Sequence, residues 1–140
     1  MIQIPKSAAQ LYETDFAAWT EKTVQLIRAG QFGQVDWDAV IEEIESLERS
    51  ERRELKSRLE VLLQHLLKWQ HQSSLRSGSW LNIIDEQRHK IADLLQDSPS
   101  LKSYLEEVLA QCYHRGLKAA SNETELPINT FPVECPYSIA

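Results

Sequence analysis

Helix-breaking residues are scarce over most of this sequence. Its 140 residues include only four glycines and five prolines, and three of the prolines fall in the last fourteen residues, at Pro127, Pro132 and Pro136. Glycine costs conformational entropy and proline removes a backbone donor, so both interrupt helices. Their absence elsewhere leaves long stretches of the chain free to form helices.

Cysteine is also rare, and Cys112 and Cys135 belong to no closely spaced motif. This pattern argues against a disulfide scaffold or a cysteine metal site, and it predicts two free thiols in a reducing cytoplasm. The sequence starts without a charged leader before an apolar run, and it holds no run of about 18 apolar residues. We therefore expect no signal peptide, no membrane span and a cytoplasmic location.

An excess of positive charge is missing as well. The net charge is −6 and the isoelectric point is about 5.2, whereas nucleic-acid binders are usually basic because lysine and arginine neutralise phosphates. The charge therefore argues against a nucleic-acid partner. Nucleophile motifs and glycine-rich phosphate loops are not found either, and the sequence predicts no cofactor.

Amphipathic periodicity divides the chain into four helices. We expect an all-α fold with helices over 8–29, 36–72, 80–97 and 99–121 and an extended tail over 122–140. Short connections between successive helices favour an up-and-down four-helix bundle. Residues 1–140 would then form a single helical domain.

The second of these helices is long, about 54 Å at the standard rise per residue. Its apolar stripe begins with Val40, Ile41, Ile44 and Leu47, and it resumes after a polar run over 48–54 with Leu55, Leu59, Leu62, Leu66 and Trp69. Either the helix bends in the polar run, or half of it extends beyond the bundle and meets another subunit. The second arrangement would make the protein a homodimer.

Several short motifs follow one another along the chain. They are Tyr12-Glu13-Thr14-Asp15-Phe16 with Trp19, Glu42 to Leu47 with Ser50-Glu51-Arg52-Arg53, His65-Leu66-Leu67-Lys68-Trp69, Ser79-Trp80, Gln87-Arg88 with Ile91, Asp97 to Leu101, Phe131-Pro132 and Cys135-Pro136-Tyr137. In this order and spacing the chain resembles domain-of-unknown-function family 29, over about residues 11 to 138. The resemblance implies a helical bundle in a bacterial cytoplasm, and it implies no known activity, substrate or cofactor.

One glutamate–histidine pair has the spacing of a metal site. Di-iron bundles use Glu-x-x-His on each of two helices, and Glu86 with His89 forms one such pair. The second position holds Gln111 and His114, with an amide in place of the required carboxylate. Helical spacing also turns His89 and His114 away from the apolar stripes, so we predict no metal.

Arg58 and His65 form a second pair, with six residues between them on one helix. In some helical ribonucleases such an arginine holds phosphate while the histidine acts as general base toward the ribose hydroxyl. The same spacing also occurs among unrelated residues of a solvated helix surface. The pair therefore carries the alternative of an RNA-cleaving enzyme.

Charge is divided along the long helix. Residues 36–48 hold six acids and no base, whereas six basic residues occur from Arg49 to Lys68. Pairs four residues apart, such as Glu54 with Arg58, account for part of this pattern as a solvated, ion-paired face. The other interpretation is a dipolar docking surface, for a protein partner or for self-association.

Polar residues near the predicted helix seams form the remaining candidate site. Gln87 lies on an apolar stripe, where an unpaired amide would cost roughly 1–3 kcal/mol, so it should have a partner. That partner could be Asp15, Glu43 or Arg53, and the set is completed by Lys68, Trp69, Trp80 and Arg88. Two interpretations stay open, a buried network that fixes helix register and a small polar cleft.

No convergent catalytic set emerges from these patterns. We therefore expect a non-enzymatic helical bundle that acts through an unknown protein partner. The alternative is a hydrolytic enzyme, either RNA-cleaving at Arg58 and His65 or acting at the polar cleft near Gln87.

Overall fold

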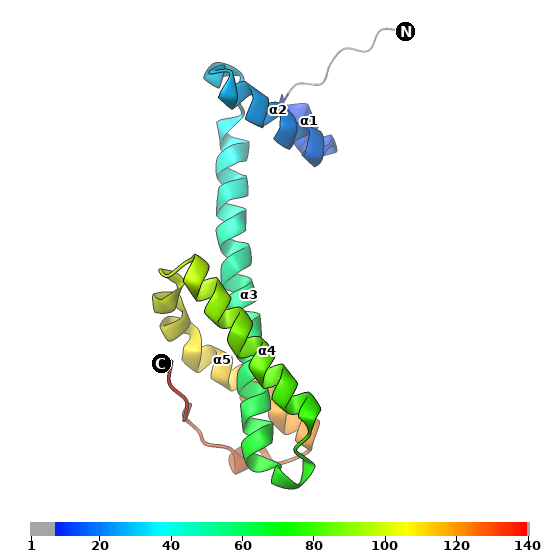
Figure 1. The fold of residues 1–140 in the computed structure, drawn as a ribbon, viewed down its shortest axis with the longest axis vertical. Helices are drawn as coiled ribbons and strands as arrows, with labels where there is room; N and C mark the ends of the chain where they lie inside the picture. Colours follow the sequence, from blue (N-terminus) through cyan, green and yellow to red (C-terminus); the bar gives the residue numbers. More distant parts are fainter. Residues whose placement is uncertain (1–7, 140) are drawn as a thin grey trace. The chain divides into compact units, whose positions relative to one another are not determined.

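The computed structural model describes residues 8–139, which form helices and no strands (Figure 1). The longer helices are α1 (Ala8–Thr14), α2 (Phe16–Arg28), α3 (Trp37–His71), α4 (Gly78–Asp97) and α5 (Leu101–Thr124). Three short 3-10 helices lie at Phe32–Gln34, Ser73–Leu75 and Ile128–Thr130. The all-α prediction is confirmed for these residues, while residues 1–7 and Ala140 lie outside the described part.

The prediction of one helix over 8–29 is wrong. Asp15 interrupts it with extended backbone angles (φ −151°, ψ 87°), and its side chain accepts a hydrogen bond from the Ala18 amide at 3.1 Å. An aspartate placed in this way satisfies an unpaired amide at a helix start, so it favours a new helix over continuation of the old one. The long helix is consequently the third helix of the chain, not the second.

The other predicted boundaries agree with the structure to within a few residues. Asp36 accepts from the Ala39 amide at 3.2 Å and begins α3, and α3 continues to His71 without a break through the polar run 48–54. Ser77 caps α4 two residues earlier than expected. α5 starts at Leu101 and extends to Thr124, three residues past the predicted end.

The chain divides into two compact units, Met1–Glu48 and Arg49–Ala140. Among its described residues, unit 1 contains α1, α2 and the start of α3. Unit 2 contains the rest of α3 with α4, α5 and the tail. A single domain and a four-helix bundle over the whole chain stay predictions.

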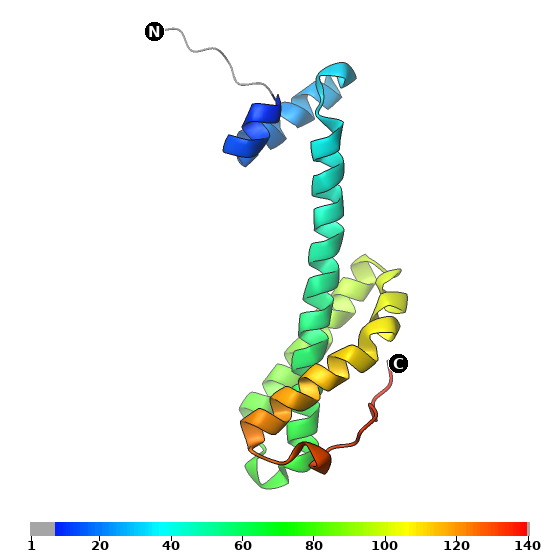
Figure 2. The same cartoon turned by 180° about the vertical axis from the view of Figure 1, so that it is seen from behind.

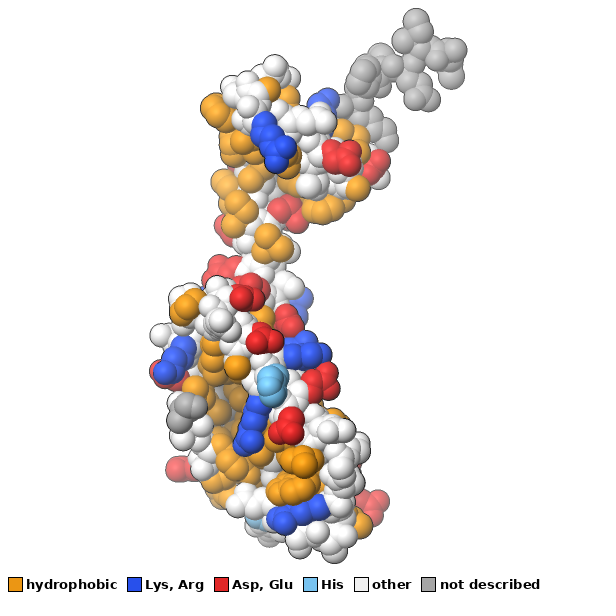
Figure 3. Space-filling model, in the orientation of Figure 1, with side chains coloured by type: hydrophobic (Ala, Val, Ile, Leu, Met, Phe, Trp, Pro, Cys, Tyr) orange, Lys and Arg blue, Asp and Glu red, His pale blue; other side chains and the backbone are white. Residues whose placement is uncertain are grey.

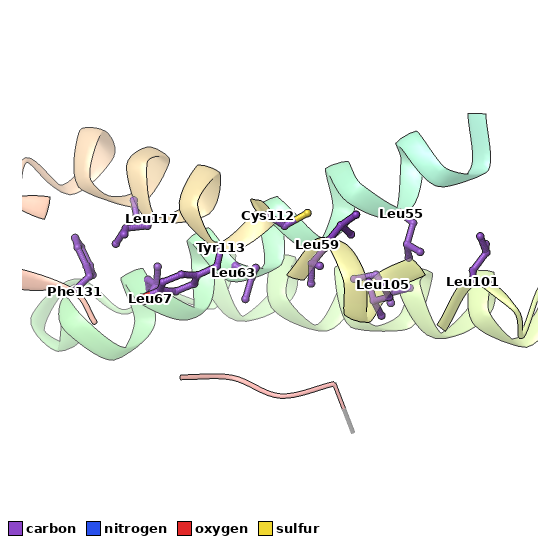
Figure 4. Close-up of a cluster of buried hydrophobic side chains, with 13 residues drawn as sticks. Leu55, Leu59, Leu63, Leu67, Leu101, Leu105, Cys112, Tyr113, Leu117 and Phe131 are labelled. Carbon is purple, nitrogen blue, oxygen red and sulfur yellow. The ribbon is translucent and has the colours of Figure 1, made fainter. Parts of the chain in front are cut away.

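The core of unit 2 forms between α3, α4 and α5. α3 and α5 run in the same direction, and α4, which connects the end of α3 to the start of α5, runs in the opposite direction (Figures 1 and 2). Four leucines spaced by four residues on α3 are buried, namely Leu55, Leu59, Leu63 and Leu67. They pack against α5 side chains that include Leu105, Cys112, Tyr113 and Leu117 (Figure 4). The predicted stripe through Leu62 and Leu66 lies at the edge of this core, because those two side chains are only half-buried.

Unit 1 has a smaller core around α2. Trp19, Thr23 and Leu26 are buried there, and the Tyr12 ring of α1 lies 4.8 Å from the Trp19 ring, centroid to centroid. The Tyr12 hydroxyl donates to the Glu43 carboxylate of α3 at 2.6 Å. Among the described residues, the buried Trp19 Nε1 and Thr23 Oγ1 have no hydrogen-bond partner.

Gly116 marks a close contact between α5 and α3. A Cβ atom at this position would lie 3.0 Å from the Glu60 carbonyl oxygen and 3.1 Å from the Leu63 Cβ. The positions of both atoms are fixed by the backbone of α3, so neither can move aside by a side-chain rotation. Glycine is therefore needed here for close helix packing, although it is a poor helix former.

Replacing Gly116 with alanine should lower the free energy of unfolding by about 1 kcal/mol or more, because overpacking outweighs the gain in helix propensity. Urea unfolding followed by far-UV circular dichroism measures this change. Gly78→Ala is the matched control, since no atom lies within 4 Å of a Cβ built there, and it should leave stability unchanged or raise it. A Gly116→Ala protein as stable as the wild type would contradict the prediction.

Candidate functional site

A buried lysine lies at the centre of the main polar cluster of unit 2. Lys68 of α3 is only 2% exposed, and its Nζ lies 2.7 Å from Glu123 Oε1 of α5. The same ammonium lies 4.4 Å from the centroid of the Trp80 ring of α4. A buried charge requires such partners, because desolvation would otherwise disfavour it strongly. This one lysine thus ties together all three helices of the unit.

Glu123 has a second hydrogen-bond partner. Gln64 Nε2 donates to its Oε2 at 2.5 Å, so both carboxylate oxygens are engaged. The Lys68 hydrogen bond lowers the pKa of Glu123 below its ordinary value, against the opposing effect of desolvation. His65 is buried beside this cluster, with Nδ1 2.8 Å from the Val61 carbonyl oxygen.

Sequence reasoning missed Gln64 and Glu123. Glu123 lies beyond residue 121, where the last helix was expected to end, whereas α5 continues to Thr124. The added turn of helix brings the carboxylate level with Lys68. The signal available in the sequence was the spacing of Gln64 and Lys68, which are four residues apart and therefore lie on one side of α3.

Gln87 does have a partner, but not one of those predicted. Arg58 Nη1 donates to Gln87 Oε1 at 3.3 Å. Arg58 also forms an ion pair with Glu54, in which its Nε and Nη2 each lie 2.9 Å from the same carboxylate oxygen, Oε1. The guanidinium of the predicted nuclease pair is therefore engaged by a carboxylate and an amide.

The predicted polar set falls into separate places. Asp15 and Glu43 belong to unit 1. Asp15 caps α2, and the Glu43 carboxylate accepts a hydrogen bond from the Tyr12 hydroxyl. In unit 2, Lys68 meets Trp80, Arg53 is exposed, and Trp69 stacks with Arg76 at 5.0 Å. Arg88 lines a cavity between the helices and the tail of unit 2. Within each unit the structure thus gives most of these residues local partners.

Groups with metal or thiol chemistry are dispersed. Within residues 8–139, no three His, Cys, Asp or Glu side chains lie close enough to hold a metal ion. Glu86 pairs with Lys90 at 2.8 Å, and His89 Nδ1 lies 3.0 Å from the Asp85 carbonyl oxygen. Both cysteines are free, as predicted, and burial raises the pKa of the Cys112 thiol to about 11.

No helix in the described part of the chain has the length and apolar character that a membrane span requires.

An exposed apolar stripe distinguishes unit 1. We call Trp37, Ile41, Ile44 and Leu47 the α3 stripe, and their exposed fractions are 43%, 52%, 61% and 69%. Figure 3 shows hydrophobic side chains at the surface of this unit. The opposite side of the helix carries Ala39, which is 3% exposed, and the half-buried Glu43 and Ser46.

The sequence left open whether this segment packs within a bundle or extends beyond it, and in the structure its stripe is exposed. Unit 1 covers the small and polar side of α3 instead, because Tyr12 binds Glu43 and the short Ala39 side chain permits close packing. The most apolar side of this segment is therefore left to solvent.

The Lys68–Glu123 pair yields a stability test. Glu123→Ala leaves the ammonium buried without its counter-charge, and the free energy of unfolding at pH 7 should fall by about 1–3 kcal/mol. Lys68→Met in the same background should recover most of the loss. Glu107→Ala, an exposed change on the same helix, should have little effect.

The pH dependence has a defined sign. Because the pKa of folded Glu123 is below the ordinary value of 4.5, its contribution is present above pH 4.5 and is lost as pH falls through the folded pKa. The stability gap between wild type and Glu123→Ala should narrow in that acidic range. A gap that stays constant there would show that the ion pair is not its source.

Comparison with known families adds one identification. The chain matches the family described as domain of unknown function DUF29 over residues 11–140, nearly its whole length. Neither the comparison with curated proteins nor the comparison with solved structures gives a match. The family match agrees in extent with the ordered motifs of the sequence, and the chain belongs to the DUF29 family.

Proposed function

We propose that this protein is a non-enzymatic helical protein that acts through protein–protein contacts, with the α3 stripe as its docking surface. The exposure of Ile41, Ile44 and Leu47, each more than half accessible, carries the proposal. Neighbouring apolar side chains exposed on one helix side are a usual mark of an interaction site. We also propose a bacterial cytoplasmic location, in keeping with the free cysteines.

A helix is the partner element that best suits this surface. The stripe residues follow one another at intervals of three and four, the spacing by which one helix packs its side chains between those of another. An amphipathic partner helix would bury the stripe with its own apolar side. Packing of this kind needs no catalytic group and no cofactor.

The charge around the stripe selects a basic partner. Residues 36–48 carry six acids and no base, so any pairing of this segment with its own copy would set acids against acids. A partner with lysine or arginine beside its apolar residues would instead gain from complementary charge. We therefore favour a basic amphipathic helix of another protein over a second copy of this chain.

Synthetic helical peptides test this proposal directly. A fluorescein-labelled peptide with leucine at heptad positions and lysine flanks should bind the protein in an anisotropy titration, whereas its glutamate-flanked counterpart should bind at least about tenfold more weakly. Ile44→Gln with Leu47→Gln should weaken the lysine peptide about tenfold or more, through lost apolar burial. Val133→Gln, at an 81% exposed residue of the tail, is the matched control and should bind as the wild type does.

All three positions are exposed, so the variants should keep the wild-type circular dichroism and stability to within about 0.5 kcal/mol. Equal binding of the two peptides, or unchanged binding by the double variant, would refute the docking surface. Light scattering decides the choice of partner. A stable dimer at tens of micromolar that the double variant abolishes would assign the stripe to a second copy.

The enzyme alternative has less support. Arg58 is paired with Glu54 and Gln87, and His65 is 8% exposed, whereas a phosphate-binding arginine and a general base must both reach the substrate. Purified protein incubated with structured RNA checks this alternative. Cleavage that is lost in a folded His65→Ala variant would overturn the non-enzymatic proposal.

A further inference from the structure

Unit 2 contains a cavity of about 600 Å³ between its helices and its tail. α3, α4, α5 and residues 136–139 all contribute to its walls. Its lining is mainly aliphatic and includes Leu62, Leu66, Leu95 and Leu109. This volume falls in the range of small-molecule sites, about 300–1,000 Å³, which are also mostly apolar with few polar groups.

The wall formed by the tail is held in place. The Tyr113 hydroxyl donates to the Pro132 carbonyl oxygen at 2.6 Å, and the Tyr137 hydroxyl donates to Gln70 Oε1 at 2.7 Å. Phe131, which lies between the end of α5 and these two contacts along the chain, is buried and packs edge-on against His71, with ring centroids 5.1 Å apart. The tail therefore runs along the helices of unit 2 as a fixed strap (Figure 2).

Arg88 is the charged side chain among the described residues that line the cavity. It is also exposed to solvent, so it lies where the cavity opens. Its guanidinium has no ion pair or hydrogen bond within residues 8–139, unlike Arg58 one helix away. An arginine in such a position offers two parallel donors to a carboxylate.

We propose that this cavity binds a free medium-chain fatty acid, with its carboxylate on Arg88 and its alkyl chain among the leucines. The aliphatic lining suits a saturated chain, and the single cation suits one anionic headgroup. A free fatty acid has one alkyl chain, whereas a membrane phospholipid has two longer ones. Figure 3 shows hydrophobic side chains exposed beside α4 in this unit, where such a ligand would enter.

Isothermal titration calorimetry with octanoate, decanoate and dodecanoate tests the proposal on the full chain. The dissociation constant should fall about fourfold for each added methylene, the gain expected from burying it. Arg88→Gln should weaken dodecanoate about tenfold and leave dodecanol unchanged, since the alcohol has the chain without the charge. Lys90→Gln removes a positive charge from the same helix without touching the cavity, so it should bind dodecanoate as the wild type does.

Ala92→Phe is a second variant that does not depend on Arg88. Ala92 lines the cavity and is exposed on α4, so the phenyl ring of phenylalanine can fill the cavity without disturbing the core. It should abolish binding of both dodecanoate and dodecanol.

Three results would overturn the proposal. The first is that dodecanoate shows no saturable binding. The second is that neither Arg88→Gln nor Ala92→Phe changes the affinity for dodecanoate. The third is that the protein sediments with phosphatidylglycerol vesicles but does not bind free dodecanoate. The last would assign Arg88 to a membrane lipid instead. The cavity belongs to unit 2 and the α3 stripe to unit 1, so either proposal can fail while the other stands.

Discussion

The close approach of α5 to α3 at Gly116 is the contact on which the described features of unit 2 depend. With no side chain at this point, the Glu60 and Gln64 backbone comes within van der Waals range of α5. The polar pairs on either side then come into reach, with Arg115 3.3 Å from Glu60 and Glu123 2.7 Å from Lys68. A wider helix separation would leave the Lys68 ammonium buried without a carboxylate, an arrangement that costs far more than one glycine in a helix.

The two units treat the apolar side of α3 differently, and this difference separates the two proposals. In unit 2 the α3 leucines are covered by α4, α5 and the tail, so the remaining space is a partly open cavity suited to a small molecule. In unit 1 the small and polar side of α3 is covered, and the apolar side stays exposed, where we propose that a partner helix binds. Burial within the chain thus accounts for the different sizes of the two proposed binding partners, a small molecule in unit 2 and a protein helix in unit 1.

Much of the architecture could be predicted from the sequence because it follows from local rules. Asp36 as a cap, the scarcity of glycine and the 3–4 spacing of leucines gave α3 to within one residue at each end. The break at Asp15 was missed because the apolar spacing of Tyr12, Phe16 and Trp19 continues across it, and periodicity outweighed capping. The Lys68–Glu123 pair was missed because its members are 55 residues apart, and the register between two helices depends on packing that no single-helix pattern contains.

Two buried polar groups of unit 1 that have no hydrogen-bond partner within residues 8–139 affect protein turnover. Trp19 Nε1 and Thr23 Oγ1 give up hydrogen bonds to water on folding and regain none within the described chain, a cost of about 1–3 kcal/mol each. So small a core has little stability in reserve, and a partner that binds only its folded form adds stability in proportion to its occupancy. Under the proposed function, unit 1 without its proposed partner would open more often and expose cleavage sites to proteases, so that the cellular lifetime of the protein would depend on whether that partner is present.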